Sequence, residues 1–231
     1  MNEPWLLDEV AHAGPEHLDP AFVAGYDRKQ GTDPAPAVAV LQRFGLAAGS
    51  VLVDLGAGTG TLACAVAPLC REVVAVDMSG PMLEYLAARA ASAGLRNVRC
   101  VRAGFMSYQH TGPPADFVYT RNALHQVPDF WKALALDRIA GFLRPGGVLR
   151  VEDLIYDFQP SQAAEVFGRW FAGAAKDPAQ GYTAADYAEH IRTEHSTFRW
   201  LFEPMLAAAG FTIEESEFHA SLYGSYVCRR G

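Results

Sequence analysis

The stretch VLVDLGAGTGTLA, residues 51–63, joins an apolar run to a helical pattern through a turn that contains three glycines. Asp54 stands near the end of the apolar run, and Gly56, Gly58 and Gly60 follow at alternate positions. Because glycine has no Cβ, such a turn lets a ligand lie against the backbone, and the following helix offers unpaired N–H groups and a positive dipole end. The stretch therefore predicts a strand, a ligand-binding turn and a helix.

Short apolar runs alternate with helical patterns from residue 51 onward, which is typical of a doubly wound α/β fold with a mostly parallel sheet. The last two runs follow each other across the short link FHA, so we expect an antiparallel hairpin. The predicted strands are VLVDL, VVAVD, VRCVR, DFVYT, GGVLRVED, FTIEESE and SLYGSYVCRR. The clearest predicted helices are TLACAVAPLC, PDFWKALALDRIAGFL and SGPMLEYLAARAASAG, the last with Ser79 as N-cap and Gly94 at its end.

Two segments flank this alternating core. About fifty residues precede the first strand and hold three helical candidates, separated by HAGPEHLDP and RKQGTDPAPA. Leu154–Trp200 is too long for an ordinary connection, so it must carry its own helices, and its place after the fifth strand predicts a lid over the binding crevice. We expect one domain with an N-terminal helical cap, a cofactor-binding core, a helical lid, and a final helix and hairpin, at residues 1–45, 46–153, 154–200 and 201–231.

Composition excludes several classes of function. The 231 residues suffice for one α/β domain, and the formal net charge of -7 disfavours a nucleic-acid partner, which usually demands a surplus of lysine and arginine. The acidic start carries no export signal and no run long enough to span a membrane, which predicts a cytoplasmic protein. Four scattered cysteines and the absence of any spaced His/Asp/Glu motif predict that there is no metal site.

Three details of the sequence describe the ligand. The dinucleotide fingerprint needs glycine or alanine at position 61, which is Thr61, so the pattern disfavours a nicotinamide cofactor. Asp77 ends the second strand, where a carboxylate accepts hydrogen bonds from ribose hydroxyls. Asp54 would repel a phosphate but suits a ligand that carries an ammonium or sulfonium beside a carboxylate. Together these details describe S-adenosylmethionine.

Four ordered segments carry a resemblance to a known family. VLVDLGAGTGTLA, VVAVDMS, ADFVYTRNALHQV and FLRPGGVLRVED resemble the successive motifs of class I S-adenosylmethionine-dependent methyltransferases, and the match covers about Leu46 to Arg230. The resemblance implies a seven-stranded sheet whose last two strands form a hairpin. The chain lacks the Asn-Pro-Pro-aromatic motif of amino methyltransferases of adenine and glutamine, and with the acidic balance this favours a small-molecule acceptor. A homodimer is left open.

The resemblance also implies which residues hold the cofactor. Gly56, Ala57 and Gly58 would hold the methionine part, and the carbonyl of Asn122 would receive its amine. Asp77 would bind the ribose, while Met78 would lie against adenine, a contact that suits a thioether.

One position departs from the family pattern. Many relatives have an aspartate after the third strand that binds adenine, but this chain has RAGFMSY, so recognition there would fall to backbone groups at Gly104 and to Phe105. The segment GYDRKQG resembles the part that closes over the cofactor, with Tyr26 as the candidate contact. A surface helix end is the alternative interpretation of that segment.

Methyl transfer from a sulfonium is an in-line displacement, so positioning and exclusion of water can supply most of the catalysis. If the acceptor must lose a proton, histidine is the natural base, and His125 and His195 are the candidates. His125 can also serve only to organise its loop. Further residues that either line the acceptor pocket or belong to the core and loops are His190, Tyr187, Trp170, Glu152 and Asp153.

Two other functions stay open at this point. A protein that binds the cofactor and regulates a partner through its lid would need no catalytic residue. A nicotinamide-dependent oxidoreductase is the other alternative, although the spacing of the glycines fits it poorly.

Overall fold

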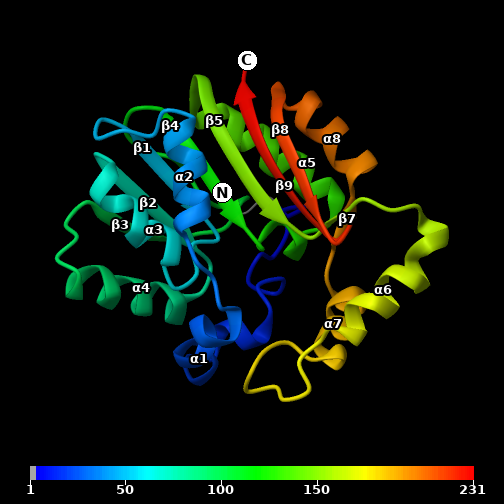
Figure 1. The fold of residues 1–231 in the computed structure, drawn as a ribbon. Helices are drawn as coiled ribbons and strands as arrows, with labels where there is room; N and C mark the ends of the chain where they lie inside the picture. Colours follow the sequence, from blue (N-terminus) through cyan, green and yellow to red (C-terminus); the bar gives the residue numbers. More distant parts are fainter. Residues whose placement is uncertain (1–3) are drawn as a thin grey trace.

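A seven-stranded sheet forms the centre of the computed structural model, which describes residues 4–231 (Figure 1). Residues 1–3 of the expected N-terminal cap lie outside the described part. Strand β9 pairs antiparallel with β5 and with β8, and all other neighbours are parallel, which confirms the predicted fold class and hairpin. The strands, in sheet order, are β3 (Val98–Arg102), β2 (Glu72–Asp77), β1 (Val51–Leu55), β4 (Ala115–Arg121), β5 (Leu143–Asp153), β9 (Tyr223–Arg230) and β8 (Phe211–His219).

Helices cover both faces of this sheet. Because side chains alternate along a strand, Val51 and Val53 of β1 face one helical layer while Leu52 faces the other. The first layer contains α5 (Asp129–Phe142) and α8 (Arg199–Ala208). The second contains α2 (Ala35–Arg43), α3 (Thr61–Val66, continued by η2 at Ala67–Leu69) and Leu86 of α4 (Gly80–Ser92).

The N-terminal segment differs from its prediction. The first of the three expected helices is wrong, because residues 4–14 form turns. The carboxylate of Asp8 accepts hydrogen bonds from the N–H groups of Val10 and Ala11, an arrangement that competes with a helix. The other two helices are present as α1 (Pro20–Gln30) and α2, and a short helix, η1 (Pro15–Leu18), precedes α1.

The insertion after β5 has helices of its own, as expected. They are η4 (Pro160–Gln162), α6 (Ala163–Ala172) and α7 (Ala184–Thr193). A two-stranded parallel sheet, β6 (Ile155–Tyr156) with β7 (Thr197–Phe198), closes the base of the insertion and was not predicted from such short runs. Figure 1 shows α1, α6 and α7 together beyond the carboxyl ends of the parallel strands. No helix in residues 4–231 is long and apolar enough to cross a membrane.

Gly60 at the start of α3 supports a prediction about stability. Its φ is 80°, and a Cβ there would lie 2.4 Å from Cγ of Leu86. Gly94 also has a positive φ, 69°, but a Cβ there would meet nothing within 4 Å. Gly94→Ala should therefore lose about 1–2 kcal/mol through backbone strain alone, and Gly60→Ala about 1–3 kcal/mol more through the clash. Denaturant unfolding of both variants measures this difference, and equal losses would contradict it.

Candidate functional site

The glycine turn is fastened to the end of β2. The backbone N–H groups of Gly56 and Ala57 both donate to the carbonyl of Val76, at 2.9 and 3.0 Å, and that of Gly58 donates to Oδ2 of Asp77 at 2.8 Å. A Cβ on Gly56 would lie 2.4 Å from Cβ of Ala123, so this position requires glycine. The turn therefore brings its backbone to the ends of both β2 and β4.

Two carboxylates lie beside the turn, Asp54, which is buried, and Asp77, which is half-buried. Burial, and to a lesser extent the negative charge of Asp77, raises the pKa of Asp54 to about 7. Burial also raises the pKa of Asp77, although hydrogen bonds from the N–H groups of Ser79 and Gly58 oppose the shift. Two such groups held close together create a site that favours a positively charged ligand.

Three cavities meet at the carboxyl ends of the strands. The first lies against β2 and the N-terminal turns, the second beside Asp54 and α2, and the third beneath α6 and α7. Tyr26, Arg121 and Asn122 line all three. Every residue predicted to hold the cofactor lines the first or second cavity: Tyr26, Asp54, Gly56, Ala57, Gly58, Asp77, Met78, Gly104, Phe105 and Asn122.

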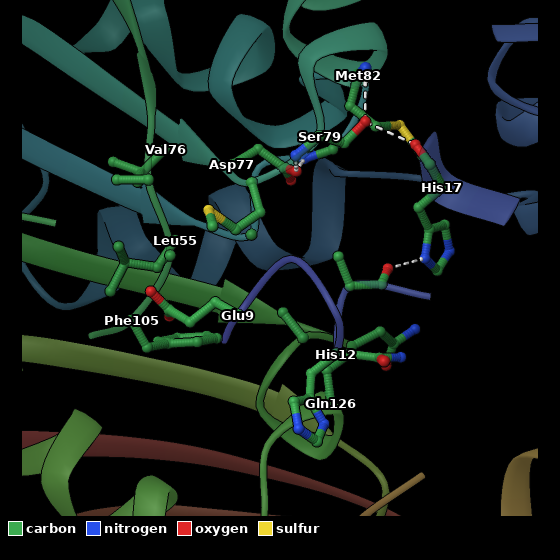
Figure 2. A pocket seen from close by; sticks show the side chains of 18 of the residues that line it. Glu9, His12, His17, Leu55, Val76, Asp77, Ser79, Met82, Phe105 and Gln126 are labelled. Carbon is green, nitrogen blue, oxygen red and sulfur yellow. Dashed lines mark hydrogen bonds between the residues drawn. The ribbon is translucent and has the colours of Figure 1, made fainter. Parts of the chain in front are cut away.

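Glu9 lies beside the loop after β3, where the family pattern has an aspartate and this chain has none. Its carboxylate accepts hydrogen bonds from the N–H groups of Met106, at 2.8 Å, and Ser107, at 3.0 Å, and lies near Phe105 (Figure 2). Gly104 makes room for it, since a Cβ there would lie 2.3 Å from Oε1 of Glu9. Sequence reasoning missed Glu9 because a lone acidic residue in a turn gives no signal of where it will lie.

Tyr26 stands where the three cavities join. Burial raises the pKa of its hydroxyl to about 12, so the phenol stays protonated, and it accepts a hydrogen bond from Gln30 at 3.1 Å. Helix α1 is held in place by an ion pair between Asp27 and Arg89 of α4. The segment GYDRKQG thus lies at the junction of the cavities rather than at a remote surface.

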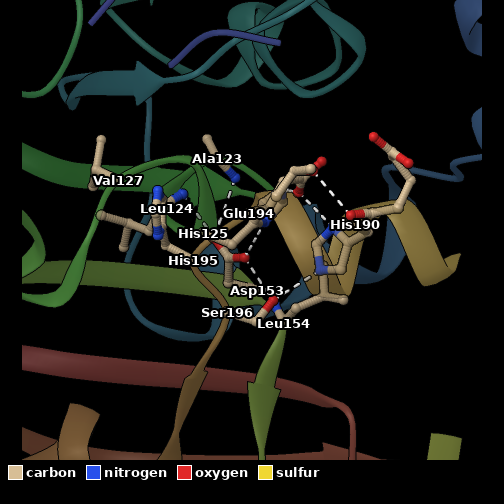
Figure 3. Close-up of polar contacts among 12 residues, drawn as sticks. Ala123, Leu124, His125, Val127, Asp153, Leu154, His190, Glu194, His195 and Ser196 are labelled. Carbon is tan, nitrogen blue, oxygen red and sulfur yellow. Dashed lines mark hydrogen bonds and ion pairs between the residues drawn. The ribbon is translucent and has the colours of Figure 1, made fainter. Parts of the chain in front are cut away.

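His125 lies between two carboxylates (Figure 3). It belongs to η3 (Leu124–Gln126), which follows β4, and its Nδ1 lies 2.5 Å from Oδ1 of Asp153 while its Nε2 lies 2.9 Å from Oε2 of Glu194. Burial opposes the charged form, but the two carboxylates raise the pKa of His125 to about 9. This arrangement joins β4, β5 and the end of α7, and it directs each ring nitrogen of His125 at a carboxylate oxygen.

His195 is among the described residues that line none of the three cavities. Its ring lies beside that of His12, with centroids 5.6 Å apart, and its backbone N–H donates to the carbonyl of His125 at 2.7 Å. Burial and the nearby Lys132 lower its pKa. The structure therefore brings His125 to the wall of the third cavity but not His195.

Aromatic side chains line the third cavity together with charged and polar ones, and the volume of this cavity is about 700 Å³. Trp170 and Tyr187 stack with their centroids 4.1 Å apart, and Lys29 lies 4.4 Å from the ring centre of Tyr182. Trp170, Tyr187 and His190, which the sequence left between core and pocket, all line this cavity. Glu152 lines the second cavity and forms ion pairs with Arg150, at 3.0 Å, and Arg121, at 3.6 Å.

Comparison with known sequences identifies the central part of the chain. Residues 52–147 match the methyltransferase domain family. The chain is 27% identical over 161 residues to an uncharacterized methyltransferase of Anoxybacillus flavithermus, covering 68% of this chain and 73% of that protein. It is 32% identical over 160 residues to trans-aconitate 2-methyltransferase of Methylobacterium radiotolerans, covering 67% and 58%. The match to uncharacterized mycobacterial methyltransferases spans 48% of their length.

Solved structures share the fold. An S-adenosylmethionine-dependent methyltransferase of Clostridium acetobutylicum aligns with a TM-score of 0.69 at 14% identity, covering 91% of this chain and 98% of that one. Magnesium protoporphyrin IX methyltransferase of Synechocystis, with bound S-adenosylmethionine, aligns with a TM-score of 0.67 at 14% identity, covering 98% and 99%. The domain match, the strand order and the glycine turn agree with the four motifs. Residues 52–147 of this chain thus match the methyltransferase domain family, and the chain as a whole has the seven-stranded fold of class I S-adenosylmethionine-dependent methyltransferases.

Proposed function

We propose that this protein transfers a methyl group from S-adenosylmethionine to a small-molecule acceptor. The observation that carries the proposal is the pair of carboxylates, the buried Asp54 and the half-buried Asp77, beside a glycine turn that opens into two cavities. A ligand with ribose hydroxyls and a cationic amino-acid end satisfies both carboxylates at once. Neither a pyrophosphate nor a nicotinamide cofactor has this combination of groups.

The three cavities suit the three parts of the reaction. The ribose and adenine would lie in the first cavity, near Asp77 and Phe105, and the methionine end in the second, near Asp54. Arg121, the one arginine of the described residues that lines all three cavities, is placed to pair with the methionine carboxylate. The methyl group would then face the third cavity.

The N-terminal turns take part in binding in this proposal. The first cavity has a volume of only about 110 Å³, and Glu9, His12 and Ala13 of the N-terminal turns are among the residues that line it. We infer that this segment moves outward to admit the adenosine end and closes again over it. Glu9 then lies at the adenine corner, where its carboxylate can accept a hydrogen bond from the amino group of the base.

The acceptor would bind beneath the insertion of residues 154–200, which acts as the lid. The third cavity, which lies there, has aromatic lining residues and a volume of about 700 Å³, both of which suit a small molecule. The formal net charge of -7 of the whole chain also favours a small acceptor over a nucleic acid. The lid is tied to the rest of the protein where Glu194 meets His125 and where Gln30 donates a hydrogen bond to the hydroxyl of Tyr182 at 2.8 Å. Catalysis would rest mainly on positioning and on the exclusion of water.

Calorimetry with S-adenosylmethionine and S-adenosylhomocysteine tests the proposal. We expect 1:1 binding of both, and no comparable binding of NADH. Incubation with methyl-labelled cofactor and a cell extract, separated by size, should then place the label in the small-molecule fraction. Absence of cofactor binding would overturn the proposal, while binding without any transfer of label would favour the regulatory alternative.

A further inference from the structure

Three potential metal ligands converge on the wall of the third cavity. The ligand atoms of His125, His190 and Glu194 all lie within 4.8 Å of one another, and all three residues line that cavity. His190 and Glu194 are four residues apart at the end of α7, so they lie on the same side of it, and His125 comes from η3 (Figure 3). A metal at this place would face the acceptor.

Each imidazole has its far nitrogen held by an oxygen. Nδ1 of His125 lies 2.5 Å from Oδ1 of Asp153, and Nε2 of His190 lies 2.8 Å from Oγ of Ser196. This leaves Nε2 of His125 and Nδ1 of His190 directed toward Glu194, with which both form ion pairs. Oxygen partners on the remote nitrogens are the usual way in which proteins orient histidine ligands of a metal.

Glu194 and Asp153 differ in how well their oxygens are satisfied. Asp153 accepts hydrogen bonds from the N–H groups of Ala123, Leu124 and Leu154 as well as from His125. Oε2 of Glu194 is buried and accepts no aligned hydrogen bond from any described residue, but it lies against two imidazole nitrogens, Nε2 of His125 at 2.9 Å and Nδ1 of His190. A cation placed between these two nitrogens and this oxygen would satisfy all three atoms at once.

We propose that Nε2 of His125, Nδ1 of His190 and Oε2 of Glu194 bind one divalent first-row transition-metal ion, such as Zn²⁺. Two imidazoles and a carboxylate are ligands that such ions prefer. Ligands at metal distances of about 2.0–2.1 Å lie roughly 3 Å apart, close to the separation seen between Nε2 of His125 and Oε2 of Glu194. The double positive charge would balance the carboxylates of Glu194 and Asp153.

The metal would give the proposed reaction a means to activate its acceptor, and this step rests on the proposed function. Three protein ligands leave open positions toward the third cavity, where the ion can bind an acceptor hydroxyl and lower its pKa, so that the proton leaves to solvent. The oxygen then uses a lone pair to form the bond to the methyl carbon. The bond between the methyl carbon and sulfur breaks, and its electron pair stays on sulfur. The products are S-adenosylhomocysteine and a methyl ether.

The proposed site differs from the expectation, drawn from the sequence, that there is no metal site. The sequence shows only His190 and Glu194 as a pair four residues apart, which is common on helices without a metal. His125 lies sixty-five positions earlier, so only the folded lid brings it to the other two ligands.

Calorimetric titration of the chelator-treated protein with Zn²⁺, and with Co²⁺ followed by its visible absorption, tests the site. We expect one ion per chain and a higher melting temperature with the metal. His190→Ala and Glu194→Gln should each weaken binding by about 100-fold or more, and Asp153→Asn by about 10–100-fold. Glu189→Gln removes the same charge from the same helix without removing a ligand, so it should change affinity by less than about twofold.

Three outcomes would overturn the metal site: no binding at one ion per chain, undiminished affinity in Glu194→Gln, or an equal loss in Glu189→Gln. Melting curves recorded without metal show whether each variant is folded. Binding of S-adenosylhomocysteine is measured on the same samples. Cofactor binding without metal binding rejects the metal site alone, whereas metal binding without cofactor binding rejects the proposed methyl transfer.

Discussion

Replacing Asp77 with asparagine is expected to weaken the binding of S-adenosylhomocysteine by about 100-fold, which corresponds to about 3 kcal/mol. The carboxylate at the end of β2 would accept hydrogen bonds from both ribose hydroxyls, and each bond to a charged acceptor contributes about 1.5–3 kcal/mol. Asparagine keeps the shape of the side chain but turns one acceptor into a donor. The new NH₂ group would then meet either a ribose hydroxyl or the N–H of Gly58, which in the wild type donates to Oδ2 of Asp77.

Asp116→Asn is the matched control for this experiment. Asp116 also accepts a backbone hydrogen bond, from the N–H of Val51 at 2.9 Å, and a side-chain one, from Arg144 at 2.6 Å. It lies at the opposite end of the sheet, so the same chemical change there should alter cofactor affinity by less than about twofold. Calorimetry measures the affinity of both variants for S-adenosylhomocysteine. Equal affinities of the wild type and Asp77→Asn would contradict the placement of the ribose in the first cavity.

Local features of the sequence were enough to predict the core of the fold. The run of residues 51–63 is a strand, turn and helix because its apolar run, its glycines and its helical spacing are all adjacent in the chain. The same holds for α4, where Ser79 caps the first turn by accepting a hydrogen bond from Met82, and Gly94 follows the last. Such elements need no long-range contact to be recognised.

Features that depend on distant contacts could not be predicted. Glu9 reaches the position beside Gly104 only because the N-terminal turns lie against the first cavity. The expected helix in residues 4–14 is replaced by turns in which the carboxylate of Asp8 accepts backbone hydrogen bonds. The surroundings of His125 likewise come from β5 and α7, far along the chain. The sequence therefore locates His125 near the crevice but cannot show that two carboxylates flank it.

Asp54→Asn should stabilise the protein without cofactor at pH 8 and weaken its binding of S-adenosylmethionine. The folded-state pKa of Asp54 is about 7, compared with an ordinary value of 3.8 for an aspartate carboxyl. Below about pH 4 the group is protonated in both states. As pH rises from 4 to 7 the unfolded chain releases this proton while the folded protein keeps it, so the wild type loses stability across that range.

Asparagine removes this pH-dependent cost because it never ionises. The gain in unfolding free energy of Asp54→Asn over the wild type should therefore grow from pH 4 to pH 7 and level off at about 2–4 kcal/mol. Denaturant unfolding at several pH values without cofactor measures the gain. Asp116→Asn, which removes an ion pair with Arg144, should show no such gain in unfolding free energy. A gain for Asp54→Asn that does not change with pH would contradict the argument that burial raises the pKa of Asp54.

S-adenosylmethionine should reverse the order of stability of the wild type and Asp54→Asn. A cation beside Asp54 restores the charged carboxylate, so S-adenosylmethionine should raise the melting temperature of the wild type at pH 8 more than that of Asp54→Asn. S-adenosylhomocysteine keeps the amine but lacks the sulfonium charge. Equal loss of affinity for both ligands in the variant would mean that Asp54 faces the amine, whereas a loss confined to S-adenosylmethionine would place it beside the sulfonium. No loss for either ligand would show that the buried carboxylate has another partner, and the methionine end would then have to lie elsewhere.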